Sequence, residues 1–397
     1  MSNLGSMLTL EYGEALPAEA RSGDGFPVFG SNGEVGRHRK FLIPEPGIIV
    51  GRKGSVGKVT WSDEPFWPID TTYWVRCASE DRHWIYWVLT WLPLARLDSS
   101  TGVPGLNRND VYALTVERPG RSAREKIAEI LDTLETAIHE TEAIIAKLKA
   151  VKQGLLHDLL TRGIDANGEL RPPQAEAPHL YKQSPLGWIP KEWEACELDQ
   201  LIDPVRPVVY GILMPGYGHP DGVPVVKVKD IIDDQIKLDS LLLTSPQIDR
   251  EYSRSRLRAG DLLFTIRGTV GRMALVPQQL ENANITQDTA RLAIKYSDAR
   301  FVKACLSMHS AARFVAINTL GVAVQGINLR DVRRIPLPKP STDEAREIAD
   351  RLDAAAQRLD CEGKKLEKLR LSKAGLMDDL LTGRVRVTPL LQEAQHA

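Results

Sequence analysis

The chain has 397 residues, 43% of them hydrophobic, and 51 basic against 52 acidic residues. This length allows about two to three domains, and the balanced charge excludes a protein that coats nucleic acid through bulk charge. It does not exclude a local basic face. Cys77, Cys196, Cys305 and Cys361 show neither paired nor metal-ligand spacing, and the most apolar stretch, 84–94, is too short to cross a bilayer. We therefore expect a cytoplasmic protein without membrane, disulfide or zinc.

The first part of the chain has short apolar runs bounded by glycine and proline, such as residues 47–51, which predict strands. That run leads into the turn Gly-Ser-Val-Gly-Lys at residues 54–58. Glycines permit positive φ and close backbone approach, and the hydroxyl and basic side chains suit an anion such as phosphate. Residues 30–60 also hold six basic against two acidic residues. This part is a candidate anion-binding surface.

A long amphipathic helix is predicted over residues 123–163. Its apolar residues alternate four and three apart, which is a heptad seam. Thr141 and Lys152 are the two polar interruptions of the seam. Residues 164–186 contain four prolines and follow Gly163, so they predict a linker to the next domain. The apolar seam residues are Ile127, Leu131, Leu134, Ile138, Ile145, Leu148, Leu155 and Leu159.

The second globular portion, residues 187–341, has the same organisation. A strand-like run at 260–266 leads into Gly-Thr-Val-Gly-Arg at 268–272, and residues 250–275 hold six basic against two acidic residues. A single turn of this kind is often an ordinary surface β-turn. Because it recurs inside both basic clusters, a functional role is favoured.

A second heptad helix is predicted over residues 342–383, followed by a tail at 384–397. Its polar interruptions, Glu362 and Lys373, lie at the positions equivalent to those of the first helix. Matching polar breaks fix register, so we expect the two helices to pack on each other within one chain. The alternative is that each helix packs only on its own domain. We predict antiparallel pairing, in rods of about 55 Å at about 1.5 Å per residue.

Most of these features result from one internal duplication of the sequence. Residues 105–161 match residues 326–382 at a constant offset of 221, which is too long for a solenoid repeat. The predicted fold class is therefore α+β, with two similar α/β domains joined by two long helices in an intramolecular antiparallel coiled coil.

No catalytic or cofactor motif is found in either copy. The sequence lacks a phosphate-binding P-loop, a nucleophile elbow, a zinc-protease motif and a dinucleotide fingerprint. Glu362 and Lys364 have the E-x-K form of a nuclease half-site, but they lie within the heptad helix without a partner acid. We expect no enzyme activity, no metal and no cofactor.

The ordered set of motifs resembles the specificity subunit of type I restriction-modification systems, over almost the whole chain. The resemblance rests on Gly-Leu-Leu-His-Asp-Leu-Leu-Thr-Arg-Gly at 154–163 and Gly-Leu-Met-Asp-Asp-Leu-Leu-Thr-Gly at 375–383. It also rests on Leu-Gly-Trp-Ile-Pro-Lys-Glu-Trp at 186–193 and on the Gly-Leu-Asn and Gly-Ile-Asn triplets at 105–107 and 326–328. The entry to each domain departs from the usual Leu-Gly-Asp pattern.

The resemblance implies a non-catalytic subunit that recognises a bipartite double-stranded DNA target in phage defence. Residues 1–122 and 187–341 would each read one half-site. The helices would set the gap, at most about 16 base pairs for 3.4 Å steps, and would dock two methyltransferase subunits, which a restriction subunit would join. DNA methylation would then follow the target sequence.

Seven residues in or just before the two turns are the candidate DNA contacts, through phosphates and base edges. Asn107 and Asn328, which precede equivalent segments, are expected in turn or capping roles. Two other functions remain open: a coiled-coil protein-interaction scaffold without DNA recognition, and an enzyme with an unrecognised site. The candidate contacts are Arg52, Lys53, Ser55 and Lys58 in the first domain and Arg267, Thr269 and Arg272 in the second.

Overall fold

The computed structural model describes residues 1–97, 105–321 and 325–390 and divides into two compact units. The first unit comprises Met1–Ile145 and Glu362–Ala397, and the second comprises Ala146–Cys361. Of the predicted tail at 384–397, residues 391–397 lie outside the described part of the chain.

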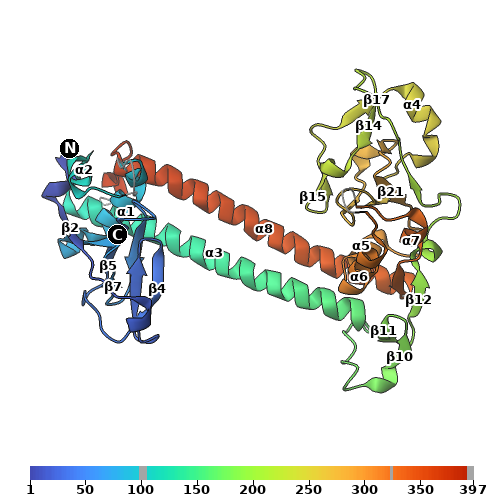
Figure 1. Cartoon of the computed structure of the whole chain (residues 1–397), viewed down its shortest axis with the longest axis horizontal. Helices are drawn as coiled ribbons and strands as arrows, with labels where there is room; N and C mark the ends of the chain where they lie inside the picture. The colour runs from blue at the N-terminus through green and yellow to red at the C-terminus, as the bar shows by residue number, and fades with distance from the viewer. Residues whose placement is uncertain (98–104, 322–324, 391–397) are drawn as a thin grey trace. The chain divides into compact units, whose positions relative to one another are not determined.

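The first unit is built on a four-stranded and a three-stranded sheet, drawn blue to cyan in Figure 1. The larger sheet is antiparallel with the order β2-β8-β5-β6, formed by Leu8–Tyr12, Thr72–Cys77, Gly47–Gly51 and Val59–Ser62. The smaller has the order β4-β3-β7, formed by Gly33–His38, Phe26–Gly30 and Trp67–Pro68, and its β3–β7 pair is parallel. A further pair joins β1 (Ser2–Asn3) to β9 (Thr115–Val116).

Helix α1 (Arg82–Trp91) covers the core face of the larger sheet. Trp84 and Trp87 of this helix are buried together with Leu10, Ile48 and Val50 of the sheet. Strand β5 has no polar side chain and is buried along its whole length, as expected for a central strand. The short helix α2 spans Arg108–Ala113.

The second unit repeats this pair of sheets. Its four-stranded sheet has the order β13-β21-β18-β19, formed by Val209–Tyr210, Thr289–Leu292, Leu262–Thr265 and Met273–Leu275. Its three-stranded sheet has the order β17-β14-β20, formed by Leu242–Thr244, Val223–Val226 and Asn284–Ile285, and the β14–β20 pair is parallel. Strands β12 (Glu194–Glu197) and β22 (Pro336–Lys339) pair as β1 and β9 do in the first unit.

Additional elements of the second unit surround these sheets. The helices are α4 (Pro246–Glu251), α5 (Ala299–Leu306), α6 (His309–Asn318) and α7 (Leu329–Arg333), and β15 (Ile231–Ile232) pairs with β16 (Gln235–Ile236). Since both units have the same strand order, including one parallel pair in the same place, the predicted duplication and α+β class are confirmed.

Two long helices pair antiparallel, as the heptads predict. Helix α3 spans Arg121–Thr161 and α8 spans Thr342–Leu381. In the first unit Glu135 pairs with Lys373, while Glu142, further along α3, pairs with Arg370, which comes earlier in α8. Because residue number rises along one helix while it falls along the other, the helices run in opposite directions.

The contact between the helices follows the predicted seam. In the first unit Ile127 of α3 is buried in the same cluster as Leu380 of α8, and in the second unit Leu159 of α3 is buried with Ile348 of α8. Thr141, a predicted polar break, is also buried, and its hydroxyl donates to the carbonyl four residues earlier at 2.7 Å. That bond satisfies the hydroxyl inside the seam.

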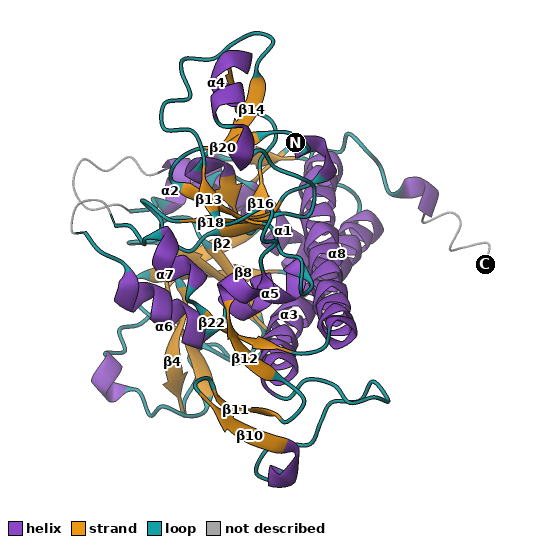
Figure 2. Ribbon diagram, turned by 90° about the vertical axis from the view of Figure 1, so that its right-hand side faces the viewer, coloured by secondary structure: helices purple, strands orange, loops and turns teal. Residues whose placement is uncertain are grey.

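The segment after α3 packs within the second unit. Gly163 ends the helix with φ of +62°, and Glu344 of α8 accepts hydrogen bonds from the backbone N–H of Ile164 at 2.9 Å and from Arg171 at 2.6 Å. Trp193 is fully buried and donates to the same carboxylate at 3.0 Å. In the chain, the hairpin of β10 (Tyr181–Ser184) and β11 (Gly187–Pro190) lies between Arg171 and Trp193 and is visible in Figure 2.

Candidate nucleic-acid interface

Each four-stranded sheet carries the same glycine turn at the same edge. In the first unit the turn joins β5 to β6, and in the second it joins β18 to β19. Gly54 and Gly57 have φ of +78° and +74°, and their counterparts Gly268 and Gly271 have +74° and +91°. Only glycine adopts this region without strain, so the four glycines dictate the turn. The two turns, which the sequence predicts to be equivalent, therefore also have the same position in the sheet and the same glycine conformations.

A second segment of the chain runs beside each turn. Lys53 forms a β-bridge with Gly105, and Arg267 forms the equivalent bridge with Gly326. The next amide of each bridging segment donates to the turn at 2.9 Å, Leu106 to the carbonyl of Arg52 and Ile327 to that of Ile266. The Gly-Leu-Asn and Gly-Ile-Asn triplets are thus held against the basic turns.

The candidate contacts of the first unit have different surroundings. Arg52 donates through Nη2 to the carbonyl of Asp70 at 2.7 Å, and Lys58 donates through Nζ to the carbonyl of Asn32 at 2.7 Å. Lys53 is exposed, and Ser55 is half-buried in the turn. Backbone carbonyls do not neutralise a cation, so Arg52 and Lys58 keep their positive charge at the surface.

In the second unit the candidate DNA contacts Arg267 and Arg272 lie in two different pockets. Arg267 is exposed and lines an open pocket beside the turn. Arg272 donates to the carbonyl of Ile231 at 3.1 Å and lines a different pocket, together with Asp233 and Asp234. Thr269 is exposed, and its carbonyl accepts a hydrogen bond from Thr265. The structure thus brings Arg267, but not Arg272, next to the bridging segment.

An exposed tyrosine lies at the same place in both sheets. Tyr12 ends β2 and Tyr210 ends β13, and each pairs with the strand that also pairs with the turn-bearing strand. Their exposed fractions are 50% and 49%. The Arg52 guanidinium lies 5.0 Å from the Tyr12 ring centre, and Arg108 approaches that ring at 5.4 Å. Planar side chains stacked beside arginine are suited to contacts with nucleotides.

These tyrosines were not found from the sequence. The neighbouring Tyr73 is buried, and burial raises its pKa to about 12, so it stays a neutral phenol at ordinary pH. Tyr12 and Tyr210 differ by 198 positions, whereas the turns differ by 214 and the helices by 221. A constant-offset comparison therefore could not pair them.

A buried arginine supports the pocket of the second unit. Arg291 donates through Nη1 to the carbonyl of Arg254 at 2.8 Å and through Nη2 to the carbonyl of Pro207 at 2.9 Å. Its burial lowers the pKa of the guanidinium to about 10, so it remains charged at neutral pH. Since Arg254 lines the pocket, this buried side chain fixes part of the pocket wall.

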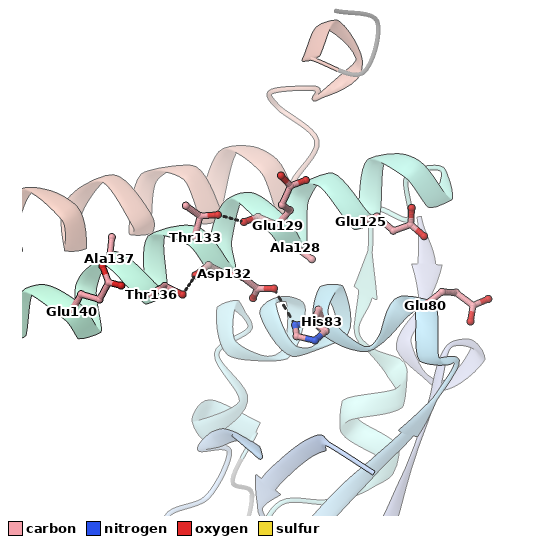
Figure 3. A pocket seen from close by; sticks show the side chains of 10 residues that line it. All are labelled: Glu80, His83, Glu125, Ala128, Glu129, Asp132, Thr133, Thr136, Ala137 and Glu140. Atoms are coloured by element: carbon pink, nitrogen blue, oxygen red, sulfur yellow. Dashed lines mark hydrogen bonds and ion pairs between the residues drawn. The ribbon is translucent and has the colours of Figure 1, made fainter. Parts of the chain in front are cut away.

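A pocket of the first unit has the opposite charge. It has a volume of about 640 Å³ and lies between α1 and α3 (Figure 3). His83 is paired with Asp132 at 3.0 Å on one side of it. The carboxylates that line this pocket repel the negatively charged phosphates of DNA, so the pocket is not part of a DNA-binding surface. Its five carboxylates belong to Glu80, Glu125, Glu129, Asp132 and Glu140.

The described residues show neither a metal-binding cluster nor a membrane-spanning helix. Across residues 1–97, 105–321 and 325–390, no group of three His, Cys, Asp or Glu side chains is arranged to hold a metal ion. In the same part of the chain, no helix has the length and apolar character needed to cross a membrane.

Comparison with known proteins gives a consistent result. Residues 1–150 match the family model described as type I restriction modification DNA specificity domain. The chain is 27% identical over 324 residues to the EcoBI specificity subunit of Escherichia coli, covering 79% of this chain and 67% of that one. Residues 1–150 thus match a specificity domain, and the chain is similar over most of its length to specificity subunits of type I restriction-modification systems.

Two further specificity subunits are similar to the chain, one in sequence and one in fold. The chain is 22% identical to the MjaVIII specificity subunit of Methanocaldococcus jannaschii, covering 73% of this chain and 66% of that one. Each match to these two relatives spans about two thirds of the relative's length. The crystal structure of a type I S subunit from M. genitalium shares the fold at a TM-score of 0.64 and 15% identity, covering 96% of this chain and 95% of that one.

Proposed function

We propose that this chain is the DNA sequence-specificity subunit of a type I restriction-modification complex and reads a bipartite target with its two units. The observation that carries the proposal is the duplicated junction of glycine turn, bridging triplet and exposed tyrosine, at the same sheet edge in both units. A site built twice suits a target with two half-sites.

In this proposal residues 1–122 and 187–341 are target-recognition domains. The helices at 123–163 and 342–383 join them, with a linker at 164–186 and a tail at 384–397. Within the first unit the two helices pair antiparallel. Such pairing suits two half-sites separated by a fixed gap.

The chemistry of binding divides between phosphates and bases. Lys58, Arg52 and Arg272 keep surface charges that attract the DNA backbone. Lys53, Ser55, Arg267 and Thr269 lie in the same turns and remain candidate contacts. Base edges would be read by side chains beside the turns, because phosphate contacts carry no sequence information.

The partners follow from the same proposal. Methyltransferase subunits, two of them, and restriction subunits would assemble with this chain on double-stranded DNA in the cytoplasm. This chain would supply recognition and no catalytic group, no metal and no cofactor. Methylation and cleavage would then be reactions of the partners.

The test is to express the full chain with a type I methyltransferase subunit and to map methylated adenines across the host genome by single-molecule sequencing. The expected result is a new bipartite motif with a fixed gap. Cells that express the methyltransferase subunit alone are the control, and they should lack the motif. A stable complex that adds no methylation with any tested methyltransferase partner would instead favour a protein-binding scaffold.

A further inference from the structure

The pocket beside the second basic turn has the chemistry of a base-reading site. Its volume is about 1040 Å³, and it lies next to the bridge between Arg267 and Gly326. It combines amides, guanidiniums and phenol rings, the groups that recognise base edges and nucleotide faces. Its lining includes Tyr210, Tyr252, Arg254, Arg267, Gln287 and Asn328.

Asn328 differs from its counterpart Asn107 in what its side chain does. Asn107 precedes α2, and its side-chain oxygen accepts a hydrogen bond from the backbone N–H of Asn109 at 2.9 Å. Asn328 precedes α7 at the equivalent position, yet its side chain makes no capping bond, and it is exposed in the pocket. The amide of Asn328 is therefore available for a ligand, while that of Asn107 has a structural role.

The backbone around Asn328 is firmly anchored. Its carbonyl accepts hydrogen bonds from the N–H groups of Asp331 and Val332, both at 3.0 Å. The preceding residue, Ile327, is buried and hydrogen-bonded to the turn. A side chain on such a fixed backbone presents its amide at little cost in conformational entropy.

The neighbours of Asn328 complete the site. Gln287 lies on the pocket wall, and its backbone N–H donates to the carbonyl of Ile212 at 2.9 Å, which holds that residue in place. Arg267 adds positive charge from the turn. A pocket lined by an amide, a cation and aromatic rings is suited to a base whose phosphate lies close by.

We infer that Asn328 reads a base of the second half-site and that this base is adenine. A carboxamide pairs with adenine through two hydrogen bonds: its N–H donates to N7 and its carbonyl accepts from the N6 amino group. This inference rests on the proposed function and assigns a specificity-determining residue within it.

The test uses the full chain co-expressed with its methyltransferase subunit. Asn328→Asp preserves shape but removes the donor that N7 requires, and Asn328→Ala removes both groups. The matched control is Asn282→Asp, the same exchange at an exposed position of the second unit outside the pocket. Each variant is analysed by genome methylation mapping and by the affinity of the purified complex for target duplexes with single base changes, after equal thermal unfolding has been verified.

The expected result is confined to one position of the second half-site. Both Asn328 variants should lose discrimination for adenine there, on the order of 10- to 100-fold in affinity, and Asn282→Asp should change nothing. Wild-type methylation of a bipartite motif with the same base preferences in both Asn328 variants would overturn the inference and leave the proposed function standing. Absence of any wild-type motif would overturn both.

Discussion

His83 and Asp132 in the first unit form the same contact as Arg300 and Asp353 in the second. His83 is the second residue of α1 and Arg300 the second residue of α5, and each reaches an aspartate on a long helix, at 3.0 Å and 2.9 Å. In both units a basic side chain on the short helix joins the globular part to the long helix. The first unit uses a histidine and the second an arginine.

The second contact is the stronger one. Arg300 also pairs with Asp298 at 2.8 Å and Asp350 at 2.7 Å, and its bonds to these carboxylates, with Asp298 first, raise the pKa of the guanidinium. We predict that Arg300→Ala lowers the free energy of unfolding by about 1–2 kcal/mol, because three carboxylates lose their shared cation. His83→Ala should cost at most about 0.5 kcal/mol, since that pair is largely solvent-exposed. Urea unfolding measures both, and equal costs would contradict the prediction.

The sequence predicts the architecture well because local patterns carry it. Heptad spacing identifies two paired helices whose seam residues, such as Ile127 and Ile348, are buried. Glycine at both ends of each turn, as in Gly54 and Gly57, predicts its left-handed geometry. These signals depend on neighbouring residues in the chain, so one sequence is enough to show them.

The candidate site was only partly accessible to the same reasoning. Tyr12 and Tyr210 become equivalent through strand pairing, and the loops between each tyrosine and its turn differ in length. The acids beside Arg272 come from the hairpin of β15 and β16, distant from it in the chain. The different roles of Asn107 and Asn328 cannot be predicted from the sequence, because both are asparagines at equivalent positions of the repeat. Such features depend on tertiary contacts and need coordinates.

Salt dependence tests the turn cations. Lys58→Ala and Arg272→Ala should each weaken DNA binding about equally for all sequences and reduce the slope of log affinity against log salt by about one unit. The reason is that a phosphate contact releases counterions, whichever base is present. Binding is measured over a series of salt concentrations, with Lys182→Ala, an exposed residue of the β10–β11 hairpin, as control. An unchanged slope removes the residue concerned from the DNA interface.

Cysteine reactivity tests the packing of both units. Burial raises the pKa of Cys77 and Cys196 to about 11 and that of Cys305 well above its ordinary value, whereas Cys361 is exposed. At pH 8 a thiol reagent should therefore modify Cys361 rapidly and the other three only after unfolding. Rapid modification of all four in the native state would contradict the packing described.

The same thiols predict the direction of a pH effect. Their pKa in the folded state lies above the value of about 8.5 for a free thiol. Their contribution to stability is therefore fully present below about pH 8.5 and is lost as the pH rises through 11. Urea unfolding at pH 8 and pH 10 should show the decline, and the Cys77→Ala/Cys196→Ala double variant should show less of it.

Two equivalent glycines inside the long helices give the final prediction. Gly154 of α3 and Gly375 of α8 are exposed, and an added Cβ would meet nothing within 4 Å. Alanine at either position should stabilise the protein by about 0.5–1 kcal/mol, because it reduces the entropy of the unfolded chain and favours helix. Gly163→Ala is the contrasting control: its φ is +62° and a Cβ would collide with Trp193, so that variant should be strongly destabilised.

The stabilised Gly154→Ala/Gly375→Ala variant also separates folding from assembly. Glycine leaves room for another backbone to approach a helix closely, and the two positions are related by the internal repeat. If the double variant unfolds at higher urea and still forms a complex with the methyltransferase subunit, the glycines carry no docking function. If it gains stability but no longer co-purifies with that subunit, the partner contacts α3 and α8 on the faces that carry Gly154 and Gly375.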